Sequence, residues 1–171
     1  PPFGLHYVKK YDLLKFCPDV YEQGKLGSCT ANAIAAAYEF DEIKQKEDNI
    51  FSPSRLFIYY NERSMEDTVD SDSGAEIRDG IKSINVKGVC SESQWPYNIS
   101  KFTDKPPDQC YKDAVKHKSL LYRRIDQSLM QLKSALFAGF PVVFGFFVFE
   151  SFESQSVADS GMMPIPEPTE K

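Results

Sequence analysis

Helix-type patterns come first along the chain, and strand-type patterns appear only in its later part. Four segments combine apolar residues at three- and four-residue spacing with residues that favour helix ends. Serine caps helix N-termini well, proline suits the first turn, and glycine often follows the last turn. We therefore predict helices over residues 28–46, from Ser52 through Tyr60, from about 74 to 86 with Gly88 as the stop, and from Ser128 to Gly139.

The fourth predicted helix carries a recognisable start signal. Ser128 and Gln131 have the spacing of a capping box, in which each side chain bonds to the other residue's backbone N–H. Leu129, Leu132 and Leu136 fall on one face of this helix, and we expect that face to point inward.

Two segments in the later part of the chain are candidate strands. Residues 119–125 form the first, and residues 142–149 are an almost continuously apolar run of strand length. Because the helices come first and the strands afterwards, the order predicts an α+β fold with segregated layers.

Composition excludes several classes of function. The chain has 171 residues, of which 42% are hydrophobic, so it can bury a core and is not a disordered polymer. With 20 basic and 25 acidic residues its net charge is −5, which argues against a nucleic-acid partner, because phosphates attract basic surfaces. The longest apolar stretch, residues 139–149, falls short of the ~20 residues that span a bilayer, so no membrane partner is expected.

The four cysteines lie at positions 17, 29, 90 and 110. They allow three disulfide pairings, and their positions select none of them. No two have the short separation typical of a zinc site. We expect neither a metal nor another cofactor, and the sequence leaves the cellular compartment open.

Cys29 stands where the first predicted helix begins. Unpaired backbone N–H groups and the helix dipole favour the thiolate at such a position, and the thiolate is the nucleophilic form. The N–H of Cys29 and the side-chain amide of Gln23 can both donate to a developing oxyanion. The alternative is a small cysteine that only fills space in the core.

The residues around Cys29 resemble a known motif. Residues 23–31 read Gln-Gly-x-x-Gly-Ser-Cys-x-Ala, which is similar to the nucleophile segment of papain-like cysteine proteases. Further blocks similar to that family follow in the family's order and extend over nearly the whole chain, at residues 51–53, 72–75, 88–97 and 132–142. Several blocks in the same order indicate a family more specifically than any single block does.

The resemblance implies a papain-like two-lobe fold in one peptidase domain, residues 1–171. About 17–118 would form a helical left lobe, and about 1–16 with 119–171 a partial antiparallel β right lobe. It implies peptide-bond hydrolysis through an acyl-enzyme on Cys29, with Gln23 in the oxyanion hole. The implied partner is an extended peptide or protein substrate, and the implied substrate-binding positions are Gly27, Ser28, Ser73, Gly74, Ala75 and Gly145.

Two residues depart from the commonest pattern of the family. Leu26 stands where most relatives have a cysteine, and Thr30 replaces an aromatic residue after the nucleophile. Both departures make the chain similar to the branch of the family found in bacteria and large viruses. Neither affects Cys29 or Gln23.

The family also uses a histidine as general base and an asparagine that orients it. The histidine usually follows the cysteine by about 130 to 150 residues, and residues 159–171 contain none. His6 precedes the nucleophile, and His117 lies in a basic run that we expect to be a solvated surface. We therefore expect the general base beyond Lys171, on a C-terminal segment or a separate chain.

Asp67, Asp70 and Asp72 form an acidic segment just before Gly74. Their spacing does not fit a calcium-binding EF-hand loop. We expect a solvated acidic loop at the rim of the cleft.

The sequence is also compatible with two functions of other classes. One is a papain-like module that binds extended peptides without cleaving them. The other is a cysteine amidase or transferase of similar architecture that acts on non-protein amides.

Overall fold

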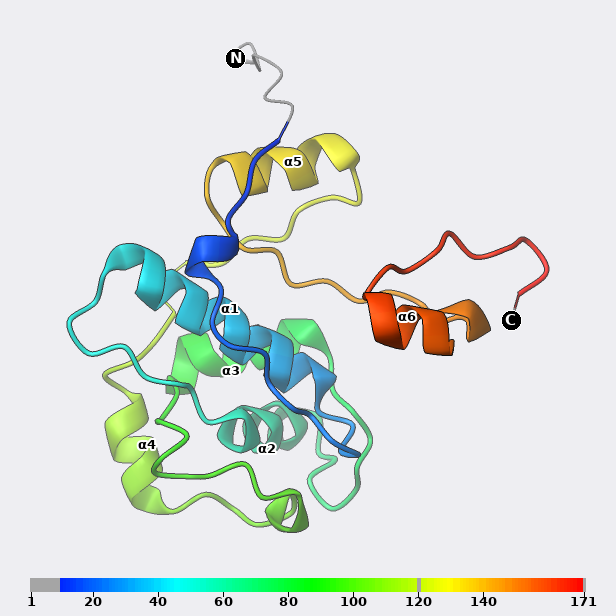
Figure 1. The fold of residues 1–171 in the computed structure, drawn as a ribbon. Helices are drawn as coiled ribbons and strands as arrows, with labels where there is room; N and C mark the ends of the chain where they lie inside the picture. Colours follow the sequence, from blue (N-terminus) through cyan, green and yellow to red (C-terminus); the bar gives the residue numbers. More distant parts are fainter. Residues whose placement is uncertain (1–9, 120, 171) are drawn as a thin grey trace.

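The computed structural model describes residues 10–119 and 121–170. Three longer helices lie side by side: α1 (Cys29–Gln45), α2 (Arg55–Met65) and α3 (Ile77–Lys87) (Figure 1). The C-terminal residues extend away from them as an arm that carries α6. The remaining helical segments are η1 (Leu14–Phe16), η2 (Ile99–Lys101), α4 (Asp108–Ala114), α5 (Leu129–Phe137), η3 (Glu150–Glu153) and α6 (Gln155–Ser160).

The core of the described residues lies among α1, α2 and α3. Residues 56–59 of α2 are all buried, so this helix is enclosed on more than one side. α1 faces it with Ala31, Ile34 and Ala35, whose small or compact side chains allow the two helices to approach closely. Ile84 of α3 completes the packing from the third side.

The three predicted helices of the first half are confirmed, with shifted ends. α2 begins later than predicted because Ser54, rather than Ser52, is its N-cap, and the Ser54 hydroxyl accepts from the Phe57 N–H at 3.1 Å. α3 ends at Gly88 as predicted. At that residue φ is +78°, and a Cβ atom would lie 1.7 Å from the Ala114 carbonyl oxygen, so only glycine fits.

α5 begins after Ser128 as predicted, but its capping box is not formed. The Ser128 side chain makes no capping hydrogen bond, and the Gln131 side chain bonds to Asp126 instead. The inward face was also predicted wrongly, since Leu129 is 67% exposed and Leu136 is exposed. A leucine stripe shows which side chains share a helix face and does not show that another element covers it.

The two predicted strands are not formed in the part of the chain that the structure describes. Residues 142–149 and the described part of 119–125 are irregular, and the β-type pairing found is one isolated bridge between Pro53 and Ser91. A strand requires ladder hydrogen bonds to a neighbour, and an apolar run does not specify that a neighbour is present. The described residues therefore show helices and irregular segments, and no β right lobe.

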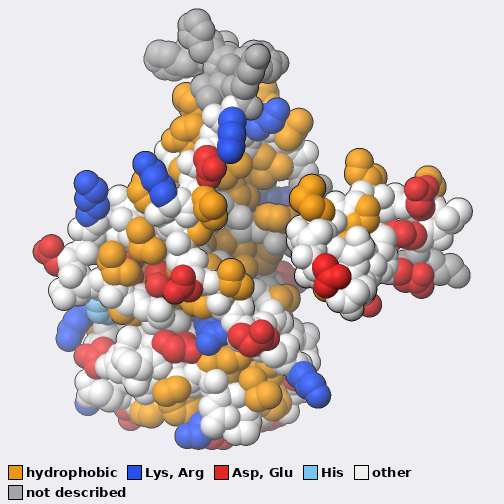
Figure 2. Space-filling view, viewed as in Figure 1, with side chains coloured by type: hydrophobic (Ala, Val, Ile, Leu, Met, Phe, Trp, Pro, Cys, Tyr) orange, Lys and Arg blue, Asp and Glu red, His pale blue; other side chains and the backbone are white. Residues whose placement is uncertain are grey.

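The residues expected to form the second strand are largely exposed. Phe144, Phe146 and Phe147 all reach the surface, and Phe147 is 88% exposed. In the space-filling view, hydrophobic side chains gather on the upper part of the visible face and on the projecting arm (Figure 2). Val143, in contrast, packs against the helical core.

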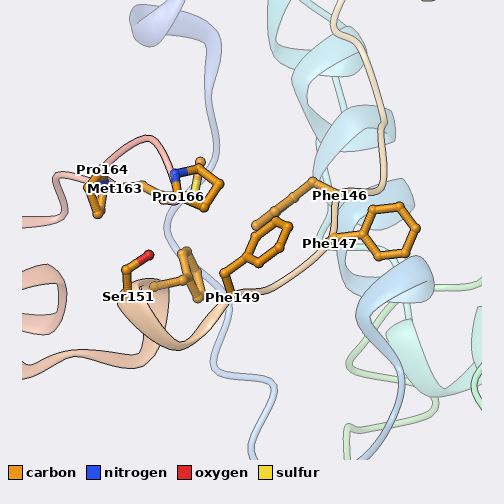
Figure 3. Close-up of a pocket in the computed structure, with 8 residues that line it drawn as sticks. Phe146, Phe147, Phe149, Ser151, Met163, Pro164 and Pro166 are labelled. Carbon is orange, nitrogen blue, oxygen red and sulfur yellow. The ribbon is translucent and has the colours of Figure 1, made fainter. Parts of the chain in front are cut away.

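The arm folds back on itself around an apolar hollow of about 280 Å³. Phe146 and Phe149 lie on one side of it, and Met163, Pro164 and Pro166 on the other (Figure 3). No residue predicted to act in catalysis lines this hollow. Among the described residues, none of the helices is both long and apolar enough to cross a membrane.

Candidate active site

Cys29 is the first residue of α1 and its side chain is exposed. The N-cap residue, Ser28, is buried, and its hydroxyl accepts the Asn32 side-chain amide at 3.1 Å but no backbone N–H of the first turn. The same hydroxyl also pairs with the Tyr97 hydroxyl. The N–H groups of the first turn are thus left without a capping side chain, beside an accessible thiol. This geometry rejects the alternative of a buried, space-filling cysteine.

The side chain of Gln23 turns towards the segment that leads into α1. Its Nε2 donates to the Leu26 carbonyl oxygen at 2.9 Å, and the Ser28 N–H donates to the same oxygen at 2.8 Å. An amide group has two N–H donors, so one remains for another acceptor. The loop thereby places a side-chain donor close to the residues that precede Cys29.

The structure brings Gly27 and Gly74 together. The Gly27 N–H lies 3.0 Å from each carboxylate oxygen of Asp72. Tyr59 donates its hydroxyl to Asp72 and accepts the Gly74 N–H at 3.2 Å. Gly74 has φ of +71°, and a Cβ atom there would lie 3.7 Å from the Gly27 carbonyl oxygen. Asp72 therefore joins the loop that precedes α1 to the loop that precedes α3. The acidic segment is thus more than a solvated rim.

The other predicted substrate-binding positions lie around this glycine pair. Ser73 is exposed and its hydroxyl donates to the Gly74 carbonyl oxygen at 3.1 Å, and Ala75 is half-buried. Gly145 comes from the C-terminal part of the chain, and a Cβ atom on it would lie 3.9 Å from the Ile77 side chain. Gly145 thus lies beside the start of α3. This helix follows residues 73–75, which we call the glycine strip.

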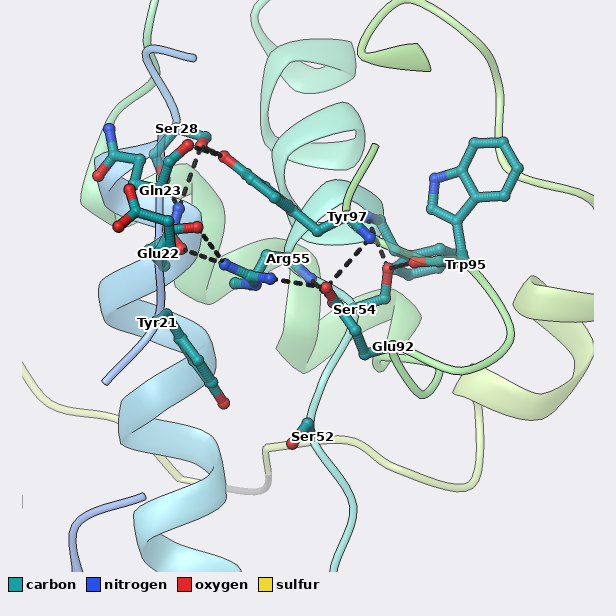
Figure 4. A network of polar contacts seen from close by, with 12 residues as sticks. Tyr21, Glu22, Gln23, Ser28, Ser52, Ser54, Arg55, Glu92, Trp95 and Tyr97 are labelled. Atoms are coloured by element: carbon teal, nitrogen blue, oxygen red, sulfur yellow. Dashed lines mark hydrogen bonds and ion pairs between the residues drawn. The ribbon is translucent and has the colours of Figure 1, made fainter. Parts of the chain in front are cut away.

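A second group of polar contacts holds the loop that carries Gln23 (Figure 4). Arg55, the first residue of α2, forms an ion pair with Glu92 at 2.8 Å. Its guanidinium stacks on the rings of Tyr97 and Tyr21, with distances of 4.0 and 4.9 Å to the ring centroids. The Tyr97 hydroxyl donates to the Gln23 carbonyl oxygen at 3.0 Å.

Glu62 lies beneath the nucleophile helix as a buried carboxyl group. Its Oε1 accepts the Thr30 hydroxyl at 2.6 Å, and its Oε2 has no hydrogen-bond partner among the described residues. A Cβ atom on Gly80 would lie 2.4 Å from that Oε2, so the α3 backbone closes tightly over it. Burial raises the pKa of Glu62 to about 8, which keeps the carboxyl protonated near neutral pH.

The structure does not bring His117 to Cys29. His117 packs its ring against Phe51 at 4.6 Å, and Phe51 in turn contacts Tyr38, nine residues after Cys29 in α1. That separation is about 14 Å along a helix axis. His6 lies outside the described residues. No group of His, Cys, Asp and Glu side chains suited to a metal ion occurs among the residues described.

The described residues thus combine an exposed thiol at a helix N-terminus with a side-chain amide in the preceding loop and with the neighbouring residues Gly27 and Gly74. No family model matches the chain. A protein of Acanthamoeba polyphaga mimivirus, described as an uncharacterized peptidase C1-like protein, is 50% identical over 176 residues. The crystal structure of xylellain, a cysteine protease from Xylella fastidiosa, superposes with a TM-score of 0.84 at 44% identity.

Over nearly its whole length the chain is therefore similar, in sequence and in fold, to papain-like cysteine proteases. The matches extend over 98% and 94% of this chain. They cover 57% of the viral protein and 64% of the xylellain chain, so this chain spans less than two thirds of either relative. Relatives from a large virus and a bacterium agree with the branch that Leu26 and Thr30 indicated.

Several contacts of this site were not predicted from the sequence. No sequence pattern marks Arg55 as part of the site. Its partners are a distant glutamate, a backbone carbonyl and a side chain of α1. Glu92 and Tyr97 belong to a block with family resemblance, which signalled their importance without showing what they bind. One feature of the sequence could have indicated that Asp72 joins the two loops, namely its place directly before the glycine strip.

The buried Glu62 makes stability depend on pH. In the unfolded chain this carboxyl ionises near pH 4.5, whereas in the folded protein it stays protonated to about pH 8. The free energy of unfolding therefore falls as pH rises from about 5 to 8, by up to about 1.4 kcal/mol per pH unit from this group. Glu62→Gln, which resembles the protonated acid, should remove that part of the slope in urea unfolding. Exposed Glu153→Gln is the matched control and should retain it. Identical slopes for Glu62→Gln and the wild type would refute the assignment.

Proposed function

We propose that the protein is a peptidase in which the Cys29 thiolate attacks the carbonyl carbon of a peptide bond. The C–N bond breaks, the amine leaves with a proton from the general base, and an acyl-enzyme thioester remains on Cys29. Water then hydrolyses the thioester and restores the thiol. The observation that carries this proposal is the accessible Cys29 thiol at an uncapped helix N-terminus beside Gln23.

The proposed oxyanion hole consists of the Cys29 backbone N–H and the free N–H of the Gln23 amide. Both groups belong to one short segment that is tied to α2 and to the 88–97 segment. Donors fixed in this way need little reorganisation when negative charge develops on the substrate oxygen.

The proposed substrate is an extended peptide lying along Gly74, flanked by Ser73 and Ala75. The Gly74 N–H already donates to Tyr59, so we expect a substrate N–H to bond to the Gly74 carbonyl oxygen, which retains acceptor capacity. Gly27 would lie on the opposite side of the bound backbone, and Gly145 would approach from the C-terminal part of the chain. Ser28 is fully buried, so it would support the loop at Gly27 rather than contact the peptide.

We further propose that residues 17–118 act as the helical lobe of a two-lobe enzyme. The β right lobe would include residues 1–16 and 119–171, and the histidine and its asparagine partner would come from a C-terminal segment or a separate chain. The exposed aromatic residues of 144–147 support this proposal, because the segment or chain that completes the right lobe would cover them.

Replacing the nucleophile tests the proposal most simply. Cys29→Ala should abolish cleavage of fluorogenic peptides, because no other thiol stands in the site. Cys17→Ala, at another exposed cysteine, is the matched control and should retain wild-type turnover. Turnover retained by Cys29→Ala would refute the assignment, and peptide binding without any turnover in the wild type would favour a silent binding module. Turnover of non-protein amides alone would favour an amidase or transferase.

Gln23→Ala should lower kcat by about 10²–10³ with a smaller change in KM, because the lost donor acts mainly on the charged transition state. Steady-state kinetics on one peptide measures both constants. Lys25→Ala, an exposed residue of the same loop, serves as the control. An unchanged kcat for Gln23→Ala would remove Gln23 from the oxyanion hole.

A further inference from the structure

Arg55 bonds to three separate parts of the molecule from the first turn of α2. Its Nη1 donates to the Glu22 carbonyl oxygen at 2.9 Å and to Asn32 Oδ1 at 3.1 Å, and its Nη2 donates to Glu92 at 2.8 Å. Glu22 directly precedes Gln23, and Asn32 lies in the first turn of α1, which begins at Cys29. One guanidinium therefore connects the backbone beside the amide donor with the helix that carries the nucleophile.

Glu92 fixes the position of Arg55 itself. Its Oε2 accepts the backbone N–H of Arg55 at 3.0 Å, while its Oε1 accepts the guanidinium and the Tyr97 N–H at 3.1 Å. A carboxylate is favoured at the N-terminus of a helix, so Glu92 holds both ends of the residue in place.

Tyr97 closes the connection on the other side. Its ring covers the guanidinium at 4.0 Å, and its hydroxyl contacts the Gln23 carbonyl and the Ser28 hydroxyl (Figure 4). Asn32 also donates to the Ser28 carbonyl oxygen at 2.9 Å. The residues immediately before the thiol and the residue that supplies the amide thus share one hydrogen-bonded network.

We propose that Arg55 is a positioning residue for the oxyanion hole: it sets the separation between the Gln23 amide and the Cys29 N–H. This proposal rests on the proposed peptidase function. A lysine cannot replace it, because an ammonium group lacks the planar fork that reaches Glu22, Asn32 and Glu92 at once.

The effect should appear in kcat rather than in KM. The glycine strip that would bind the substrate backbone is held separately, by the side chains of Asp72 and Tyr59, whereas the Arg55 side chain bonds to Glu22, Asn32 and Glu92. Loss of Arg55 therefore leaves the strip in place and loosens only the donors that act on the transition state.

The test combines kinetics on the protein with a double-mutant cycle. Arg55→Lys should lower kcat about tenfold or more, with KM changed less than threefold. In the Gln23→Ala background the same change should have almost no further effect, because Arg55 acts through Gln23. Arg78→Lys, an exposed arginine of α3, is the control and should match the wild type. Equal losses in both backgrounds, or an unchanged kcat, would overturn the proposal.

Hydrogen–deuterium exchange gives a readout that does not need turnover. Arg55→Lys should speed exchange in residues 21–30 while residues 56–65 keep wild-type protection. Unchanged exchange in 21–30 would overturn the positioning role whether or not the protein cleaves peptides. If Arg55→Lys does not fold, Glu92→Gln weakens the same network more mildly and should produce the same pattern. Wild-type protein without Cys29-dependent turnover would instead refute the peptidase assignment.

Discussion

The half-buried ion pair between Arg55 and Glu92 connects the parts on which the site depends. Only 13% of the Arg55 side chain and 23% of the Glu92 side chain remain exposed. Partly burying such a pair removes water from both charges, and the loss is offset only where hydrogen bonds replace the water. Here the guanidinium meets a carboxylate, a carbonyl and an amide oxygen, and lies between two aromatic rings. The main effect that we propose for this ion pair is to hold the loop that carries Gln23 in a fixed position relative to α1.

α2 carries a second buried arginine at its other end. Arg63 donates to the carbonyl oxygens of Val69 and Ser71 at 2.8 and 2.9 Å and stacks on Tyr59. These bonds shape the loop that delivers Asp72 to Gly27. α2 therefore holds both loops of the candidate site. Arg55 bonds to the loop that carries Gln23, and Arg63 bonds to the loop that leads to the glycine strip.

The helices α1, α2 and α3 could be predicted because their main signals are local: apolar spacing along each helix and, for α3, a terminal glycine. The serine signals were less exact, since Ser54 rather than Ser52 caps α2. The cysteine and the residues around it were also recognisable, since the motif is contiguous from Gln23 to Ala31. The strand predictions over 119–125 and 142–149 failed because a strand is defined by a partner that an apolar run does not encode. Arg55 and Asp72 escaped prediction because their bonds reach backbone groups far away in the sequence.

The proposed peptidase function depends first on Cys29 as a nucleophile in a peptide-binding site. The most direct measurement is labelling of the protein with a peptide-like epoxide, followed by peptide mapping in a mass spectrometer. Cys17 is the internal reference, because both thiols are exposed in the structure. A nucleophilic Cys29 should take one equivalent of label, and Cys17 should take none. Equal labelling of the two cysteines, or no labelling of Cys29, would contradict this proposal.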